Sequence, residues 1–371
     1  MAKKKITQKA PGDSRRVNEK NFCYFPFSQL LLQPTGLISP CCWNQDFIAG
    51  EIQKENVMEI WNGEKMRNLR AEFLAGKPVI CEKQMRHMGC HKWSHRLGKK
   101  GLDLMEVQPY GPRRLDLRLN GRCNLKCVMC DVWRQPNGLY EKSNFWEVAP
   151  KEIFPYLLEM DVLGGEPLIQ HDTYRLIREV SSVNSGCTWA FVTNGQYKFG
   201  PVVREHLDLL NIRWIQVSID SLNPETYKAI RPGAGDLFKV IQTLKDLLEY
   251  RYERLLLRRG FNITASICVQ QKNWSELGDF LEYARDLKVE PVVQFAYIPD
   301  SESILAFDRL TRQKILAHYE DLLDSHEAEH LMPVILPLRD SLKAAGDELI
   351  KNELAKDVSY LKDASEVPAE L

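Results

Sequence analysis

Hydrophobic and polar residues alternate along several short segments between residues 113 and 300, which is the pattern of β-strands. Segments with helical periodicity separate them, most clearly where Leu237, Val240, Leu244 and Leu247 follow one another at steps of three and four. Strands connected by helices predict a parallel α/β sheet, which we interpret as a partial (β/α)6 TIM-like barrel. The predicted strands are 114–120, 161–163, 188–193, 214–220, 262–270 and 292–298.

Three of these strands have only one apolar face, whereas strands covered by helices are normally apolar on both faces. The segment 114–120 alternates leucine with polar residues such as Asp116 and Arg118, and 215–220 and 263–270 alternate in the same way. Helices must cover the apolar face, and unpaired polar groups in a packed lumen would cost about 1–3 kcal/mol each. The sequence therefore predicts a lumen that binds a polar ligand. The alternative is that one or two of these strands lie at sheet edges and face water.

The rest of the chain differs in composition from this core. The first twenty residues hold seven Lys/Arg and two Asp/Glu, which predicts a disordered basic tail. The next segment has five cysteines, two short helical patterns and little strand signal, so metal binding is expected to hold it together. We therefore divide the chain into a tail (1–20), a cysteine-rich, metal-binding module (21–105), a core (106–300) and a helical C-terminal extension (301–371).

The overall charge excludes some classes of function. The chain of 371 residues has 50 basic and 50 acidic residues, which disfavours a nucleic-acid coat or a polybasic membrane binder. It contains no apolar run long enough to span a membrane, and no apolar stretch follows the charged start as in a secretory signal. We expect a cytoplasmic protein without nucleic-acid or membrane partners. In that reducing compartment, ten cysteines indicate metal or redox chemistry.

Three cysteines, Cys123, Cys127 and Cys130, lie within eight residues just after the first core strand. A zinc site normally has four ligands. A [4Fe–4S] cluster can accept three thiolates, which leaves one iron open for a substrate or cofactor. Because barrel enzymes keep their active sites at the C-terminal ends of the strands, this loop is the predicted site.

The Cys-x3-Cys-x2-Cys spacing after a first strand resembles the radical S-adenosylmethionine (SAM) superfamily, and further motifs of that family follow in the same order. The resemblance implies that the Gly-Gly-Glu-Pro segment meets the SAM amino group through its backbone, that the Ser-Ile-Asp segment contacts the ribose, and that an arginine lies near the SAM carboxylate. Met129 departs from the family, which often has an aromatic residue there. The implied SAM-binding residues are Gly164, Gly165, Glu166, Asn194, Ser218, Asp220 and Arg231, and the implied cluster ligands are Cys123, Cys127 and Cys130.

The resemblance also implies the chemistry. SAM would chelate the open iron, and one electron from an external reductant would cleave SAM into methionine and a 5′-deoxyadenosyl radical. The radical would abstract a hydrogen atom from the substrate. The protein contributes binding, orientation and exclusion of water, while the cofactor performs the chemistry. The sequence identifies no catalytic acid or base.

The upstream cysteines resemble a second family element. Twelve residues separate Cys23 from Gly36 and four separate Gly36 from Cys41, as in the opening of SPASM and twitch extensions. Together with Cys81 and Cys90, the resemblance implies four ligands of one auxiliary [4Fe–4S] cluster, as in the shorter twitch type.

This element departs from the family because it lies before the barrel in the chain. Two alternatives stay open, one for a ligand and one for the metal. Cys42 could replace its neighbour Cys41 as a ligand. Zinc could bind instead, because Cys90 is followed by His91 and His95 and preceded by His87.

These observations predict a radical SAM iron–sulfur enzyme. Resemblance to the SPASM/twitch group implies a peptide or protein substrate. A small-molecule substrate is the alternative within the same chemistry. A non-catalytic, metal-stabilised binding or regulatory protein is the alternative of another class.

Overall fold

The computed structural model describes residues 22–343 apart from short gaps at 45, 84, 86–89 and 96–101. The predicted basic tail, the end of the predicted C-terminal extension and His87 lie outside the described residues. No helix in the described part of the chain is long and apolar enough to cross a membrane.

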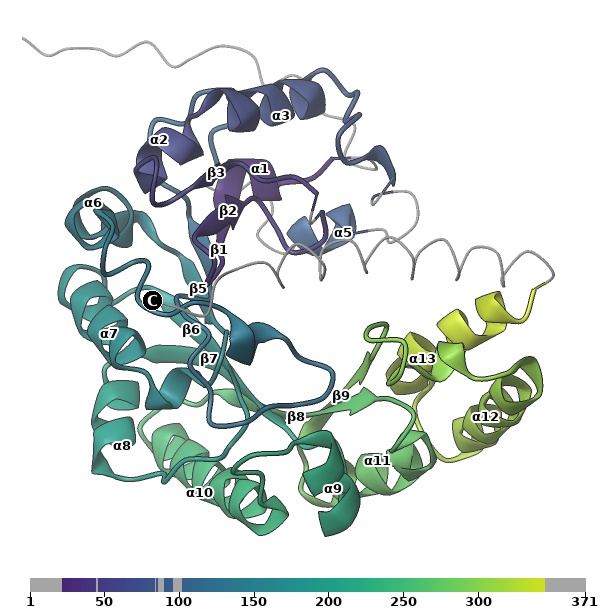
Figure 1. Cartoon of the computed structure of the whole chain (residues 1–371). Helices are drawn as coiled ribbons and strands as arrows, with labels where there is room; N and C mark the ends of the chain where they lie inside the picture. The colour runs from purple at the N-terminus through teal and green to yellow at the C-terminus, as the bar shows by residue number, and fades with distance from the viewer. Residues whose placement is uncertain (1–21, 45, 84, 86–89, 96–101, 344–371) are drawn as a thin grey trace, which may run out of the picture.

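One sheet of nine strands, in the order β3-β2-β1-β4-β5-β6-β7-β8-β9, forms the framework of the molecule (Figure 1). From β4 to β9 every neighbouring pair is parallel. These six strands confirm the predicted core, with boundaries that differ by a few residues. They are β4 (Arg114–Leu117), β5 (Glu159–Val162), β6 (Thr188–Thr193), β7 (Asn211–Ser218), β8 (Asn262–Val269) and β9 (Glu290–Phe295).

Helices connect the parallel strands, and α7, α8, α10 and α11 lie along the outer side of the curved sheet (Figure 1). The α10 helix begins where Asp236 accepts hydrogen bonds from the N–H groups of Phe238 and Lys239, and its predicted apolar face is buried. The sheet with its outer helices confirms the predicted partial barrel. The helices are α6 (Phe145–Glu152), α7 (His171–Val183), α8 (Pro201–Asp208), α9 (Pro224–Ile230), α10 (Leu237–Leu256) and α11 (Leu277–Asp286), with short 3-10 turns η2 (Val132–Arg134), η3 (Phe154–Tyr156), η4 (Pro167–Ile169) and η5 (Trp274–Glu276).

The N-terminal module contains strands that the sequence pattern did not predict. The β1 strand pairs in parallel with β4, so the module extends the barrel sheet. The reason for the difference is length: strands of four, three and two residues leave no room for a visible alternation. The module consists of α1 (Phe25–Ser28), β1 (Gln29–Leu32), β2 (Leu37–Ser39), β3 (Gly50–Glu51), α2 (Val57–Trp61), α3 (Glu64–Leu74) and α5 (His91–Ser94).

A fully buried arginine holds the module together. Arg70 donates hydrogen bonds to three backbone carbonyls, those of Pro26 (2.7 Å), Trp61 (2.7 Å) and Glu106 (2.8 Å). Its guanidinium also stacks 4.2 Å from the centre of the Trp61 ring. No carboxylate pairs with it among the described residues, and burial lowers the pKa of Arg70 to about 9. The carbonyl oxygens therefore replace the water that this cation loses.

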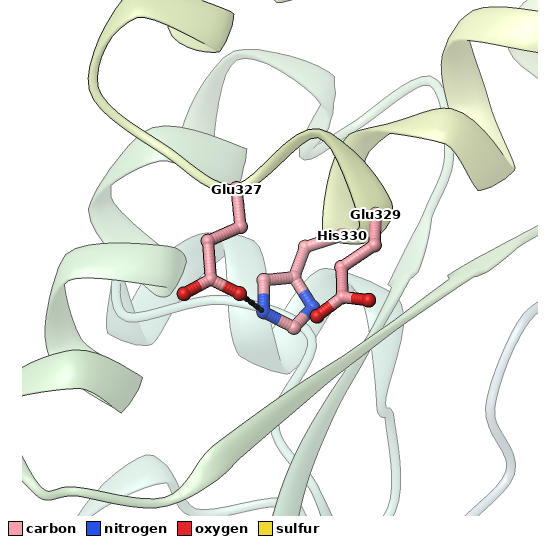
Figure 2. Close-up of side chains that lie close together, drawn as sticks. All are labelled: Glu327, Glu329 and His330. Atoms are coloured by element: carbon pink, nitrogen blue, oxygen red, sulfur yellow. Dashed lines mark ion pairs between the residues drawn. The ribbon is translucent and has the colours of Figure 1, made fainter.

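The chain continues after β9 into helices, as predicted, with α13 packed against β9 and α12. At the start of α13, Glu327 and Glu329 flank His330, and Glu327 lies 3.5 Å from the His330 ring (Figure 2). Carboxylates at a helix start complement the helix dipole, which accounts for this surface cluster. The elements are η6 (Ile304–Ala306), α12 (Arg309–Asp321), η7 (Leu322–Asp324) and α13 (Ala328–Ser341).

Candidate functional site

The cysteine triplet lies in the loop after the C-terminal end of β4, as the sequence predicts. Each thiol is close enough to another to raise its pKa, although burial is the larger cause in all three cases. Burial raises the pKa of Cys127 to about 11. One loop therefore brings Cys123, Cys127 and Cys130 together.

Backbone hydrogen bonds fix this loop against the segment that follows α9. Lys126 N–H donates to the Pro232 carbonyl at 2.9 Å, and Val128 N–H donates to the Ile230 carbonyl at 3.0 Å. The Asn194 amide lies at the other side of the loop, 3.6 Å from the Cys123 sulfur. The position of the thiols thus depends on residues far away in sequence.

The Gly-Gly-Glu segment after β5 packs directly on the cysteine loop. Gly164 and Gly165 have φ angles of +81° and +50°, and a Cβ on Gly165 would lie 2.1 Å from the Arg122 carbonyl oxygen. The same oxygen accepts a hydrogen bond from Glu166 N–H at 3.0 Å. Glycine is therefore needed for the close approach of the two loops.

The Glu166 carboxylate connects the loops after β5 and β6. It accepts hydrogen bonds from the Thr193 hydroxyl (2.7 Å), the Asn194 N–H (2.7 Å) and the Leu168 N–H (3.1 Å). It is fully buried, and burial raises the pKa of Glu166 to about 7. Donors from the chain itself occupy this carboxylate, so only the backbone of the segment is left for the predicted contact with SAM.

Asp220 and Arg231, predicted to contact SAM separately, form a buried ion pair at 2.7 Å. Asp220 also accepts a hydrogen bond from Cys268 N–H at 2.8 Å. Burying an Asp220 carboxylate without partners would be costly, and Arg231 and the Cys268 N–H offset this cost. The remaining residue of that motif, Ser218, faces Ser266 with 3.4 Å between their hydroxyl oxygens.

Arg231 also faces the cysteine triplet. Its guanidinium lies 3.8 Å from the Cys127 sulfur. Burial opposes the positive charge, but Asp220 and Cys127 outweigh it and raise the pKa of Arg231. A permanent cation at this position favours the thiolate form of Cys127 that an iron ligand needs.

The four predicted ligands of the module also lie near one another. Burial is the largest cause that raises the pKa of Cys23, and the nearby Cys41 thiol is the second. The Cys81 thiol raises the pKa of both Cys23 and Cys41. The Cys90 thiol in turn raises the pKa of Cys81. Cys42 differs, because after burial the strongest influences on its pKa are the charges of Asp116 in β4 and of Arg118 just after it. This arrangement favours Cys41 over Cys42 as a ligand.

The spacing of the thiols fits a cluster better than a single ion. Four thiolates around one zinc ion lie about 3.8 Å apart, given Zn–S bonds of about 2.3 Å. Among the described residues, Glu327, Glu329 and His330 are the only group of three or more potential ligands within 4.8 Å of one another, so neither cysteine set is that compact. A cuboidal four-iron cluster is larger than one ion and suits the wider spacing. Of the histidines proposed for zinc, His95 already lies 2.8 Å from the Phe22 carbonyl oxygen.

Strand directions separate the two cysteine sets. Cys123 follows the end of β4, whereas Cys23 comes before β1, which is parallel to β4, and Cys41 follows β2, which is antiparallel to β1. Cys23 and Cys41 therefore lie toward the opposite ends of the strands from Cys123.

The comparisons with known proteins agree with this geometry. The model of the radical SAM superfamily matches residues 117–284. The model of the SPASM iron–sulfur cluster-binding domain matches residues 23–87. The chain belongs to the radical SAM superfamily. Its SPASM domain lies N-terminal to the radical SAM domain, and the matched segment includes Cys23, Cys41 and Cys81 but ends before Cys90.

Several known proteins are similar to this radical SAM chain. GTP 3′,8-cyclase of Clostridium botulinum is 23% identical over 241 residues, which cover 62% of this chain and 72% of that protein. GTP 3′,8-cyclase of Synechocystis is 28% identical over 194 residues, covering 50% and 54%.

Solved structures are similar at lower identity. Streptococcus suis SuiB bound to its precursor peptide SuiA matches with 13% identity and a TM-score of 0.43, covering 78% of this chain and 70% of that chain. SuiB bound to S-adenosylmethionine matches with 14% identity and a TM-score of 0.42, and this chain spans 60% of it.

The predicted enzyme class and cofactors are confirmed. The chain is a radical SAM iron–sulfur enzyme with a SAM-binding [4Fe–4S] cluster, SAM and an auxiliary iron–sulfur cluster in the SPASM domain. The non-catalytic alternative and the zinc alternative are therefore wrong. The individual ligands and SAM contacts stay predictions.

Sequence reasoning missed an ion-pair network on the inner face of the sheet. Asp161 pairs with both Arg114 and Arg213, and Arg213 also pairs with Glu159. The alternation of polar residues in β4 signalled a polar face, but it did not indicate which charges meet.

Proposed function

We propose that this radical SAM enzyme modifies a peptide or protein by abstracting hydrogen from an unactivated carbon. The observation that carries the proposal is the balance of charge on the inner face. Its ion pairs, together with the Asp220–Arg231 pair beside the cysteine loop, join four arginines to four carboxylates. These arginines are Arg114, Arg118, Arg213 and Arg231, and the acids are Asp116, Glu159, Asp161 and Asp220.

A balanced face suits a polar substrate without strong net charge, such as a peptide segment. A nucleoside triphosphate carries several negative charges, and its binding would need unpaired cations. A nucleotide is nevertheless the second candidate, because the similar curated proteins are GTP 3′,8-cyclases.

The position of the inner face supports the same proposal. We propose Cys123, Cys127 and Cys130 as ligands of the SAM-binding cluster, and Cys23, Cys41, Cys81 and Cys90 as ligands of the auxiliary cluster. A substrate on the inner face would lie between these two sets. When bound, the cofactors supply the electron and the carbon radical that removes hydrogen.

The chain's own residues hold these groups in place. Glu166 fixes the loop after β6 and so positions Asn194 beside Cys123. Arg231 stabilises the Cys127 thiolate, and the glycines after β5 let their loop support the cysteine loop. An external one-electron reductant is required as a partner.

The experiment is anaerobic reconstitution followed by two substrate assays. The reconstituted chain is expected to hold about eight irons and to release 5′-deoxyadenosine from SAM. Each short peptide encoded beside the gene is then co-expressed with the chain, and its intact mass is measured for loss of hydrogen. In parallel, GTP is offered to the purified enzyme. A modified peptide together with unchanged GTP supports the proposal. Consumption of GTP with matching 5′-deoxyadenosine release would overturn it.

A further inference from the structure

We propose that Asp116 and Arg118 anchor the main chain of the substrate on the inner face, between the two cysteine sets. The inference rests on the proposed peptide substrate, because it assigns that substrate's binding groups. Neither residue belongs to a family motif that the sequence displays.

The facing polar atoms of this pair are poorly satisfied. Arg118 Nε lies 3.5 Å from Asp116 Oδ1, which is an ion pair but not a hydrogen bond. Both atoms are buried and lack a hydrogen-bond partner in the described part of the chain. Buried polar groups in folded proteins are nearly always hydrogen-bonded, so this pair needs an explanation. A bound ligand provides one.

The pair is also open to the inner face. The side chains of Arg118 and Asp116 keep 29% and 12% of their surface exposed. The neighbouring Asp161 differs, because two arginines donate to it. Asp116 and Arg118 are therefore charged groups with capacity left for a ligand.

The pair lies between the glycine turn after β5 and the end of β2. Arg118 lies against the glycine turn after β5, since a Cβ on Gly164 would come within 2.7 Å of the Arg118 Cβ. Asp116 is in register with Leu31 of β1, which is in register with Ser39 of β2. The chain leaves β2 at Ser39 and soon reaches Cys42, which is an exposed residue.

Cys42 thus lies close to the pair. Ser39, three residues before Cys42, shares the register of Asp116 through Leu31 of the intervening strand β1. The Cys42 thiol is therefore a place to attach a probe beside the proposed anchor.

The chemistry of the pair defines what it binds. A carboxylate accepts hydrogen bonds, and a guanidinium donates them. In an extended peptide, the N–H donor and the carbonyl acceptor of one residue face the same side, so one residue would satisfy both groups at once. It would also leave the charge of the inner face balanced. A guanine base offers the same two kinds of group, and it is therefore the competing ligand in the test.

The test is disulfide capture at Cys42 of the reconstituted holoenzyme under anaerobic conditions. Three small disulfides of matched length are used, which carry an N-acetylalanine methylamide unit, a guanine base or a plain hydroxyl group. Mass spectrometry measures labelling of Cys42 under mild thiol competition, and Cys42→Ser shows that labelling is specific.

We expect the peptide-unit disulfide to label Cys42 about tenfold more than the hydroxyl control, as expected for a hydrogen bond to a charged group. The preference should be lost in both Asp116→Asn and Arg118→Gln. It should persist in Arg178→Gln, which removes an exposed arginine from the surface helix α7. Iron content and melting temperature check that the variants are folded. If either Asp116→Asn or Arg118→Gln does not fold, the labelling of the other variant tests the inference.

Equal labelling by the peptide and hydroxyl probes would overturn the inference. Preference for guanine would also overturn it and assign the pair to a nucleobase. Retention of the peptide preference in the folded variants would show that other residues form the anchor. Capture does not depend on turnover, so failure of this inference appears here, whereas failure of the proposed function appears in the GTP assay.

Discussion

Replacing Gly165 with alanine is expected to disable the enzyme through one backbone contact. The φ angle of Gly165 is +50°, and a Cβ there would lie 2.1 Å from the Arg122 carbonyl oxygen and 2.7 Å from the Gln170 amide nitrogen. Gly138 is the matched control. Its φ angle is +74°, but a Cβ there would meet no atom within 4 Å. Both substitutions place an alanine at a positive φ angle, but only the one at Gly165 brings a Cβ against other atoms.

The magnitude follows from these geometries. An alanine in the left-handed region costs about 1–2 kcal/mol, which is the whole effect expected at Gly138. At Gly165 the obstacle is a backbone oxygen, so the two loops must separate, and overpacking of this kind costs about 1–3 kcal/mol more. Separation also weakens the 3.0 Å hydrogen bond from Glu166 N–H to Arg122, worth about 1 kcal/mol. Gly165→Ala should therefore lower the free energy of unfolding by about 2–4 kcal/mol more than Gly138→Ala does.

Two measurements check this prediction. Urea unfolding of the reconstituted proteins gives the two free energies, and anaerobic release of 5′-deoxyadenosine reports on the cysteine loop. Gly138→Ala should cleave SAM normally, whereas Gly165→Ala should lose most of this activity. If both variants are equally stable and equally active, the close approach of the two loops does not position the cysteines, and the reasoning is refuted.

Three further predictions concern the module and Glu166. Cys41→Ser should lower the iron content by about four per chain, whereas Cys42→Ser should leave it unchanged, as measured by iron analysis. Arg70→Met should lower the free energy of unfolding by about 3–5 kcal/mol, because it leaves two buried carbonyls and a partly buried one without their donor; urea unfolding checks this, and a change below about 1 kcal/mol would contradict it. Burial raises the pKa of Glu166 from 4.5 to about 7, so the folded chain binds more protons than the unfolded chain between these values. The free energy of unfolding should therefore fall by about 3 kcal/mol as the pH rises through this window and level off above it, and Glu166→Gln should remove this dependence in unfolding experiments at several pH values.

Local patterns in the sequence were sufficient for the core of the fold. The alternation in β4, β7 and β8 predicted one polar and one apolar face, because side chains of a strand point to opposite sides. The cysteine spacing in the loop after β4 indicated a cluster, again from residues that are close together in the sequence. Thiols a few residues apart in one loop meet whatever the rest of the chain does.

The short strands of the module could not be predicted in this way. Leu30, Leu31 and Leu32 are all buried, so β1 shows no alternation, and its pairing with β4 joins residues more than eighty positions apart. The sequence suggested a separate metal-held module, whereas the structure joins it to the barrel sheet.

Tertiary structure alone decided which polar groups meet. The sequence placed Asp220 and Arg231 at the site, but their pairing depends on how α9 returns the chain to the end of β7. It left Cys41 and Cys42 equivalent, and only the path after β2 directs one thiol toward the other cysteines and its neighbour toward β4. Periodicity and spacing follow from the geometry of the local backbone, which the sequence encodes directly. Contacts between distant segments depend on how the whole chain packs, and for that reason the partners of buried charges appear only in the folded structure.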